Sequence, residues 1–154
     1  MRHLRFLAAP LLIGLCAVVA AAGTVPNKLQ EAFASLDASL SPDQRLAFMQ
    51  RPEREAISKA HFAIGLFIRN QWLRSGKSAL TGELQKLGAG SFDDMSSMIL
   101  ASCWRHLHGK PIRLEQQGAC YKRWWLAQQN LINEAKAQGR NSYSSPNFDC
   151  PPES

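Results

Sequence analysis

The chain has 154 residues, of which 45% are hydrophobic, and its formal net charge is +6 at pH 7. This length is enough to bury one hydrophobic core and too short for two domains, since about 100–200 residues per domain is usual. A modest positive charge favours contact with anionic surfaces, but it does not identify one.

Residues 1–22 have the pattern of a secretory signal peptide. Arg2 and Arg5 precede an apolar run over residues 6–22 that ends in small residues, as signal peptidase requires. The run is at the short end of the roughly 17–25 residues that cross a bilayer, and Pro10 interrupts it. We therefore predict cleavage and a periplasmic or secreted protein. An inner-membrane anchor formed by residues 6–22 is the alternative.

Export limits the partners that the protein can meet. Two of the 18 basic residues and none of the 12 acidic residues lie in the signal segment, so the remaining chain has a formal charge of +4. Outside the cytoplasm nucleic acid is not an expected partner. We expect an envelope protein or an anionic surface, and a membrane only if the signal segment is retained.

After the signal segment, apolar residues recur at helical spacing and no strand pattern competes. Ser41 with Gln44, and Ser91 with the acidic residues that follow it, have the pattern of helix N-caps. We predict an all-α, single-domain bundle of about five to six helices over residues 27–139, followed by a flexible tail over residues 140–154. The expected helices cover approximately residues 29–40, 42–51, 53–73, 80–87, 92–108 and 114–137.

The helix expected over residues 53–73 is the strongest prediction. One apolar stripe includes Ile64, Ile68 and Trp72. Phe62, Leu66 and Leu73 form a second apolar face. We therefore expect this helix to be central and surrounded by the others.

Three cysteines follow the signal segment, and an oxidising compartment favours a disulfide. Cys103 lies eight residues before Pro111, and Cys120 lies nine residues after it. In an antiparallel helix pair that turns at this proline, the two thiols fall at nearly the same height. We predict a Cys103–Cys120 disulfide in preference to Cys120–Cys150, although the tail could reach either partner.

Arg69 lies on an otherwise apolar helix, where a guanidinium is costly unless it is paired. Asp93 or Asp94, at the start of a later helix, is the expected counter-charge, and Asn70 could complete the network. One interpretation is a structural clip between two helices. The other adds His61 and makes the same residues a pocket for an anionic ligand.

Two stretches that contain these residues resemble a bacterial domain family of unknown function. Residues 65–72 read G-L-F-I-R-N-Q-W and residues 93–100 read D-D-M-S-S-M-I-L, similar to the G-x-x-I-R-N-x-W and D-D-M-S-x-x-I-L motifs of that family. The resemblance implies a helical fold and the location of a site, but no activity. The candidate polar cluster comprises His61, Arg69, Asn70, Trp72, Asp93, Asp94 and Ser96.

Other patterns are weaker. His106 and His108 are two apart on a helix and point to different sides, so we predict no metal site. No nucleophile motif is present, and we predict no cofactor. The sequence favours a non-enzymatic binding or interaction module of the cell envelope. The alternative is a small enzyme or anionic-ligand binder that uses the Arg69, Asn70, Asp93 and Asp94 cluster.

Overall fold

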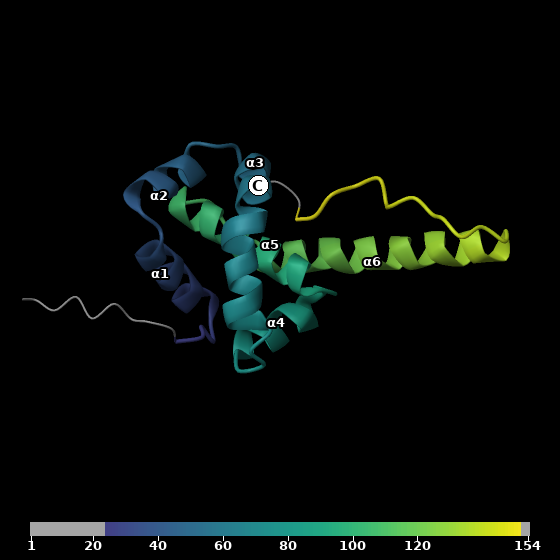
Figure 1. Ribbon diagram of the computed structural model, residues 1–154, viewed down its shortest axis with the longest axis horizontal. Coiled ribbons are helices and arrows are strands. Elements are labelled where there is room, and N and C mark those ends of the chain that lie inside the picture. Colours follow the sequence, from purple (N-terminus) through teal and green to yellow (C-terminus); the bar gives the residue numbers. More distant parts are fainter. Residues whose placement is uncertain (1–23, 152–154) are drawn as a thin grey trace, which may run out of the picture.

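The computed structural model describes residues 24–151, and these residues form helices joined by turns, with no strand among them (Figure 1). The all-α prediction is therefore confirmed. The predicted signal peptide lies outside the described residues. The helices are α1 (Leu29–Ser39), α2 (Pro42–Met49), α3 (Glu53–Ala60), η1 (His61–Gly65), η2 (Ile68–Leu73), α4 (Ala79–Leu87), α5 (Phe92–Leu107) and α6 (Leu114–Ala137).

Both predicted N-caps are formed. The Ser41 hydroxyl accepts a hydrogen bond from the Gln44 amide at 3.2 Å, and the Gln44 side chain accepts one from the Ser41 amide at 2.9 Å. Ser91 and Asp94 make the same reciprocal pair at the start of α5. Each capping box satisfies backbone donors that the first helical turn leaves without a partner.

The helix expected over residues 53–73 is continuous but not regular. It begins as α3, and η1 and η2 are wound as π-helix. A π-helical turn adds one residue to each hydrogen-bonded ring and is often found at functional positions. The wider turns change which side chains share a face, so the pattern expected for a regular α-helix does not hold along its whole length.

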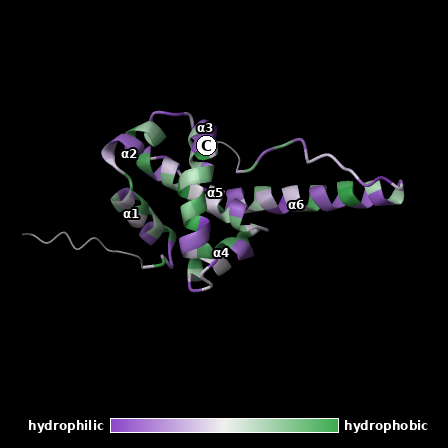
Figure 2. Ribbon diagram, viewed as in Figure 1, coloured by the Kyte–Doolittle hydropathy of each residue, from purple (hydrophilic) through white to green (hydrophobic). Residues whose placement is uncertain are grey.

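The centre of the bundle is α5. It contacts each of the other helices, and its side chains from Met95 to Arg105, except Ser97, are buried. The prediction that the 53–73 helix is surrounded was wrong, because its second apolar face is open at Phe62 and Leu66, although Leu73 is buried. Phe62 is 81% exposed and Leu66 is 44% exposed. Figure 2 shows the hydropathy of the residues along each helix of the bundle.

The last helix, α6, extends beyond the other helices, and the segment that follows it runs back beside it toward α3 (Figure 1). Near its start α6 passes close to the end of α4, where a Cβ atom on Gly118 would overlap the carbonyl group of Leu87. Within residues 24–151, no helix combines the length and the apolar character needed to cross a membrane.

The returning segment ends in the disulfide. Cys150 is bonded to Cys120, with their Cα atoms 5.8 Å apart, and Cys103 is a buried free thiol. The predicted Cys103–Cys120 disulfide is therefore wrong. Cys103 lines a hollow with Phe33 and Asp37, on the side of α5 that faces α1, whereas Cys120 faces the tail. Similar height along two helices does not make two side chains face each other.

Candidate functional site

The guanidinium of Arg69 is buried and has three partners. Its side chain is 6% exposed, and its Nε atom lies 3.3 Å from Oδ1 of Asp93. Nη1 donates to the Ser96 hydroxyl at 3.0 Å, and Nη2 donates to the His61 carbonyl oxygen at 3.3 Å. Ser96 in turn donates to the Asp93 carbonyl oxygen. This arrangement joins η2 to the first turn of α5, as the clip interpretation expects.

Asp93 links this buried cation to the surface. Its side chain is 60% exposed, and its Oδ1 atom lies 3.5 Å from Nε2 of His61 as well as close to Arg69. The histidine contact becomes an ion pair only when the imidazole is protonated. The carboxylate therefore has one side toward the buried guanidinium and the other toward water.

Gly65 makes room for the guanidinium. A Cβ atom at this position would lie 3.1 Å from Nη1 of Arg69 and 3.6 Å from a side-chain carbon of Leu100. Such a contact is tighter than ordinary packing, so a larger residue would push the guanidinium away from its partners. This steric requirement gives a physical reason for the glycine that precedes Arg69 by four residues.

Asp94 does not pair with Arg69. Its Oδ2 atom accepts hydrogen bonds from the amides of Gly90 and Ser91, at 2.8 and 2.9 Å, and from the indole nitrogen of Trp125 at 2.7 Å. Asp94 thus caps α5 and ties it to α6. Of the two candidate counter-charges, the structure assigns Asp93 to the arginine.

Two other residues of the predicted cluster lie apart from it. Asn70 is exposed, and its side-chain oxygen accepts a hydrogen bond from Arg74 at 3.1 Å. Trp72 is 5% exposed and packs in the core, with its ring edge-on to Phe67. The cluster that the structure brings together is therefore His61, Arg69, Asp93 and Ser96.

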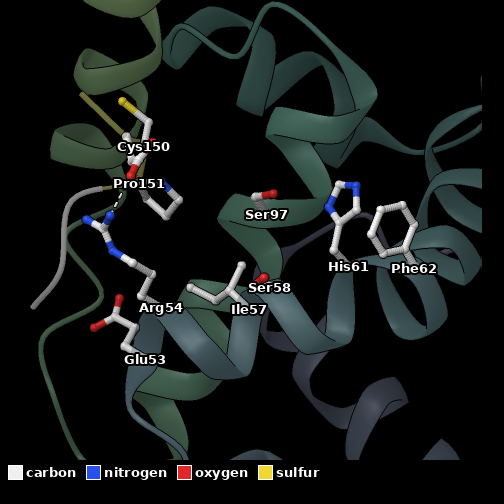
Figure 3. A pocket seen from close by; sticks show the side chains of 10 residues that line it. Glu53, Arg54, Ile57, Ser58, His61, Phe62, Ser97, Cys150 and Pro151 are labelled. Atoms are coloured by element: carbon white, nitrogen blue, oxygen red, sulfur yellow. Dashed lines mark hydrogen bonds and ion pairs between the residues drawn. The ribbon is translucent and has the colours of Figure 1, made fainter. Parts of the chain in front are cut away.

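A hollow of about 400 Å³ lies next to this cluster (Figure 3). His61 and Phe62 lie on one side of it and Arg54 and Pro151 on the other, with Ser97 of α5 between them. Arg69 does not line this hollow. A ligand in the hollow would meet the imidazole of His61, the phenyl ring of Phe62 and the side chain of Arg54, but not the guanidinium of Arg69.

Sequence reasoning missed a second buried ion pair. Nε and Nη2 of Arg105 lie 2.7 and 2.6 Å from Oε1 of Glu53, and the two side chains are 1% and 5% exposed. Nη1 of Arg105 donates to the Ile112 carbonyl oxygen at 2.9 Å. The spacing does indicate that Arg105 is buried, because it follows the buried Ser102 by three residues and so lies on the same side of α5. It does not indicate which residue pairs with Arg105.

The histidines near the end of α5 serve packing. His106 stacks on Phe33, and His108 stacks on Trp104 with its ring nitrogens near the carbonyl oxygens of Trp104 and Met49. Among residues 24–151, no group of three or more histidine, cysteine, aspartate or glutamate side chains is arranged to hold a metal ion.

Burial also changes the chemistry of two side chains. Desolvation, with a smaller contribution from the Asp37 carboxylate, raises the pKa of the Cys103 thiol to about 11. Burial likewise raises the pKa of the Tyr121 hydroxyl well above its usual range. Both groups are therefore neutral at physiological pH, and Cys103 has little nucleophilic character.

Comparison with known proteins identifies the family. No curated protein and no solved structure matches the chain. One family model, described as "Domain of unknown function (DUF6794)", matches residues 25–107, which is more than half of the chain and extends from just before α1 to the end of α5. The chain therefore belongs to the family of domains of unknown function DUF6794.

Proposed function

We propose that the protein is an exported, non-enzymatic binding module of the cell envelope, with a contact surface centred on Phe62. The observation that carries the proposal is the exposure of this ring, which is 81% accessible at the rim of the hollow. Leu66, four residues later, is 44% exposed. Aromatic side chains that stay open to water next to a concave surface are typical of protein contact sites.

The buried cluster supports binding by this surface rather than chemistry at Arg69. An anionic ligand would have to displace the Asp93 carboxylate and enter a site in which the guanidinium side chain is only 6% exposed. Arg69 already donates to Ser96 and to a backbone carbonyl group. Its role as a clip is sufficient to account for a cation at this position.

Export is the part of the proposal that rests on sequence. The basic start, apolar middle and small-residue end of residues 1–22 support cleavage and release into the envelope or the medium. Fractionation of cells that express the full chain, followed by N-terminal sequencing, tests this directly. A protein that starts shortly after residue 22 is expected, and an intact N-terminus in the membrane fraction would favour the anchored alternative.

The contact surface is tested by retention of envelope proteins on immobilised protein, compared between Phe62→Asp and Leu126→Asp. Leu126 is a matched control, because it is a 65% exposed apolar residue on α6. We expect Phe62→Asp to lose a partner that the wild type and Leu126→Asp both retain. Equal retention by all three proteins would contradict the proposed surface.

A further inference from the structure

Residues 149–151 lie in a trough formed by α3, α5 and α6. Asp149 pairs with Arg54 of α3, and Cys150 is bonded to Cys120 of α6. The Tyr121 hydroxyl donates to the Cys150 carbonyl oxygen at 2.9 Å. Residues 149–151, which we call the strap, are thus held by a charge, a covalent bond and a backbone hydrogen bond.

The strap divides the trough into two hollows. The larger, of about 400 Å³, lies on the side of Ile57, His61 and Phe62, and the smaller, of about 230 Å³, lies on the side of Tyr121 and Trp124. Ser97, Asp149 and Cys150 line both. Figure 3 shows the larger hollow, with Cys150 and Pro151 forming one of its walls. Without the strap the two hollows would be one groove across α5.

We infer that this groove is a binding site for an extended peptide that carries a carboxylate two residues before a proline, and that the strap occupies it as an internal ligand. The strap itself identifies the chemistry. Arg54 pairs with a carboxylate, Tyr121 donates to a backbone carbonyl oxygen, and Pro151 lines the groove together with the apolar side chain of Ile57. A peptide of another protein can present the same three features. This inference rests on the proposed function, because it supplies a partner class for the surface beside Phe62.

The disulfide controls access to the groove. Cys120 is 3% exposed, whereas Cys150 is half-buried and lines both hollows, so we expect a reductant to reach the bond from the side of Cys150. A dithiol reductant attacks Sγ of Cys150, the S–S bond breaks, and Cys120 leaves as a thiolate that takes up a proton. The second thiol of the reductant then displaces Cys150. The protein gains two thiols, and the reductant leaves as a disulfide.

The test uses the full chain and a fluorescent peptide of residues 145–151 that carries Cys150→Ser. In the strap-released protein, Cys150→Ser removes the bond and Asp149→Ala removes the carboxylate that pairs with Arg54. We expect the released protein to bind the peptide at least ten-fold more tightly than the oxidised wild type does. The Cys103→Ser protein keeps the disulfide and should behave as the wild type. Adding Arg54→Glu to the released protein should weaken binding at least five-fold, and a peptide with Asp149→Lys should restore it.

The inference is overturned if the released protein binds no better than the oxidised one, or if Arg54→Glu has no effect. Formation of dimers by the released protein, detected by light scattering, would also overturn it, because a second copy's tail would then be the occupant. If the released variant does not fold, wild type reduced with a phosphine replaces it, with circular dichroism as the check on folding. If the released protein does not bind the peptide but the wild type still retains an envelope partner that Phe62→Asp loses, the peptide-binding inference is wrong and the proposed function is still supported.

Discussion

Replacing Asp93 by alanine should destabilise the protein more than replacing Arg69 by methionine, because the two charges are buried to different extents. The side chains of Arg69 and Asp93 are 6% and 60% exposed. Arginine stays protonated at every accessible pH, so Asp93→Ala leaves a buried cation with only neutral acceptors on Ser96 and His61. In Arg69→Met the remaining carboxylate is free to be hydrated.

The magnitudes follow from this asymmetry. Removing one partner of a fully buried pair costs about 3–5 kcal/mol, and the exposure of Asp93 reduces this to about 2 kcal/mol. Arg69→Met keeps most of the side-chain volume and loses two hydrogen bonds to neutral groups and an ion pair with the exposed Asp93, which costs about 1 kcal/mol. Urea unfolding followed by circular dichroism should give this order, and the midpoint temperatures should differ by about 3–5 °C.

One correction is needed before the two variants are compared. Asp93 also lies in the first turn of α5, where a negative charge stabilises a helix by about 0.3–1 kcal/mol. Glu115→Gln measures this contribution, because Glu115 is exposed in the first turn of α6. If Arg69→Met still costs as much as Asp93→Ala after this correction, the argument from unequal burial is refuted.

Three further predictions concern packing, titration and crosslinking. Gly118→Ala should lower the free energy of unfolding by about 1–3 kcal/mol in a denaturant titration, since its Cβ would overlap a backbone carbonyl group of α4. Gly82→Ala should instead raise the free energy of unfolding by up to about 1 kcal/mol, because Gly82 lies inside α4 and its Cβ would meet nothing within 4 Å. Burial raises the pKa of the Cys103 thiol to about 11, so the stability that the neutral thiol contributes should be complete below about pH 9 and lost as the pH rises toward 11. Over this range the free energy of unfolding should fall by about 2 kcal/mol more in the wild type than in Cys103→Ala. The same pH dependence in both proteins would contradict this prediction. Mass spectrometry of non-reduced peptides should find Cys150 joined to the cysteine of α6 and Cys103 free, and any peptide linked through Cys103 would disprove the assignment.

The features that the sequence predicted correctly depend on near neighbours in the chain. The capping box of Ser41 and Gln44 spans three residues, and so does the cap of α5 by Ser91, because both require only one helical turn. Helix bounds follow from proline, glycine and apolar spacing in the same way. The clip could also be expected, since a guanidinium at position 69 on an apolar stripe requires a partner from elsewhere.

The features that were missed depend on the direction in which each side chain points from its helix. Consecutive helical residues point about 100° apart, so Asp93 faces Arg69 while Asp94 faces the indole of Trp125, and the sequence alone does not say which is which. The pair of Arg105 and Glu53 joins positions 52 residues apart. No local pattern contains that information.

Exposure of apolar residues presented a similar difficulty. The periodicity that includes Phe62 and Leu66 is the same whether a helix face meets the core or a partner, because both environments exclude water. Expecting a surrounded helix was reasonable from the pattern and incorrect for these side chains. Such an error is informative, since an apolar face that the fold leaves open is a candidate for contact with another molecule.

The boundary of the family domain divides the groove between two parts of the chain. Residues 25–107 contain Arg54, Phe62 and Ser97, which line the larger hollow, as well as the whole Arg69 clip. Tyr121, which donates to the strap, and the strap itself come after this domain. The domain therefore contains the proposed contact surface beside Phe62 and the buried polar contact of Arg69, while the strap that covers the proposed groove is held by α6 and by Arg54. Variants of the first group should change affinity for a partner, and variants of the second group should change access to it.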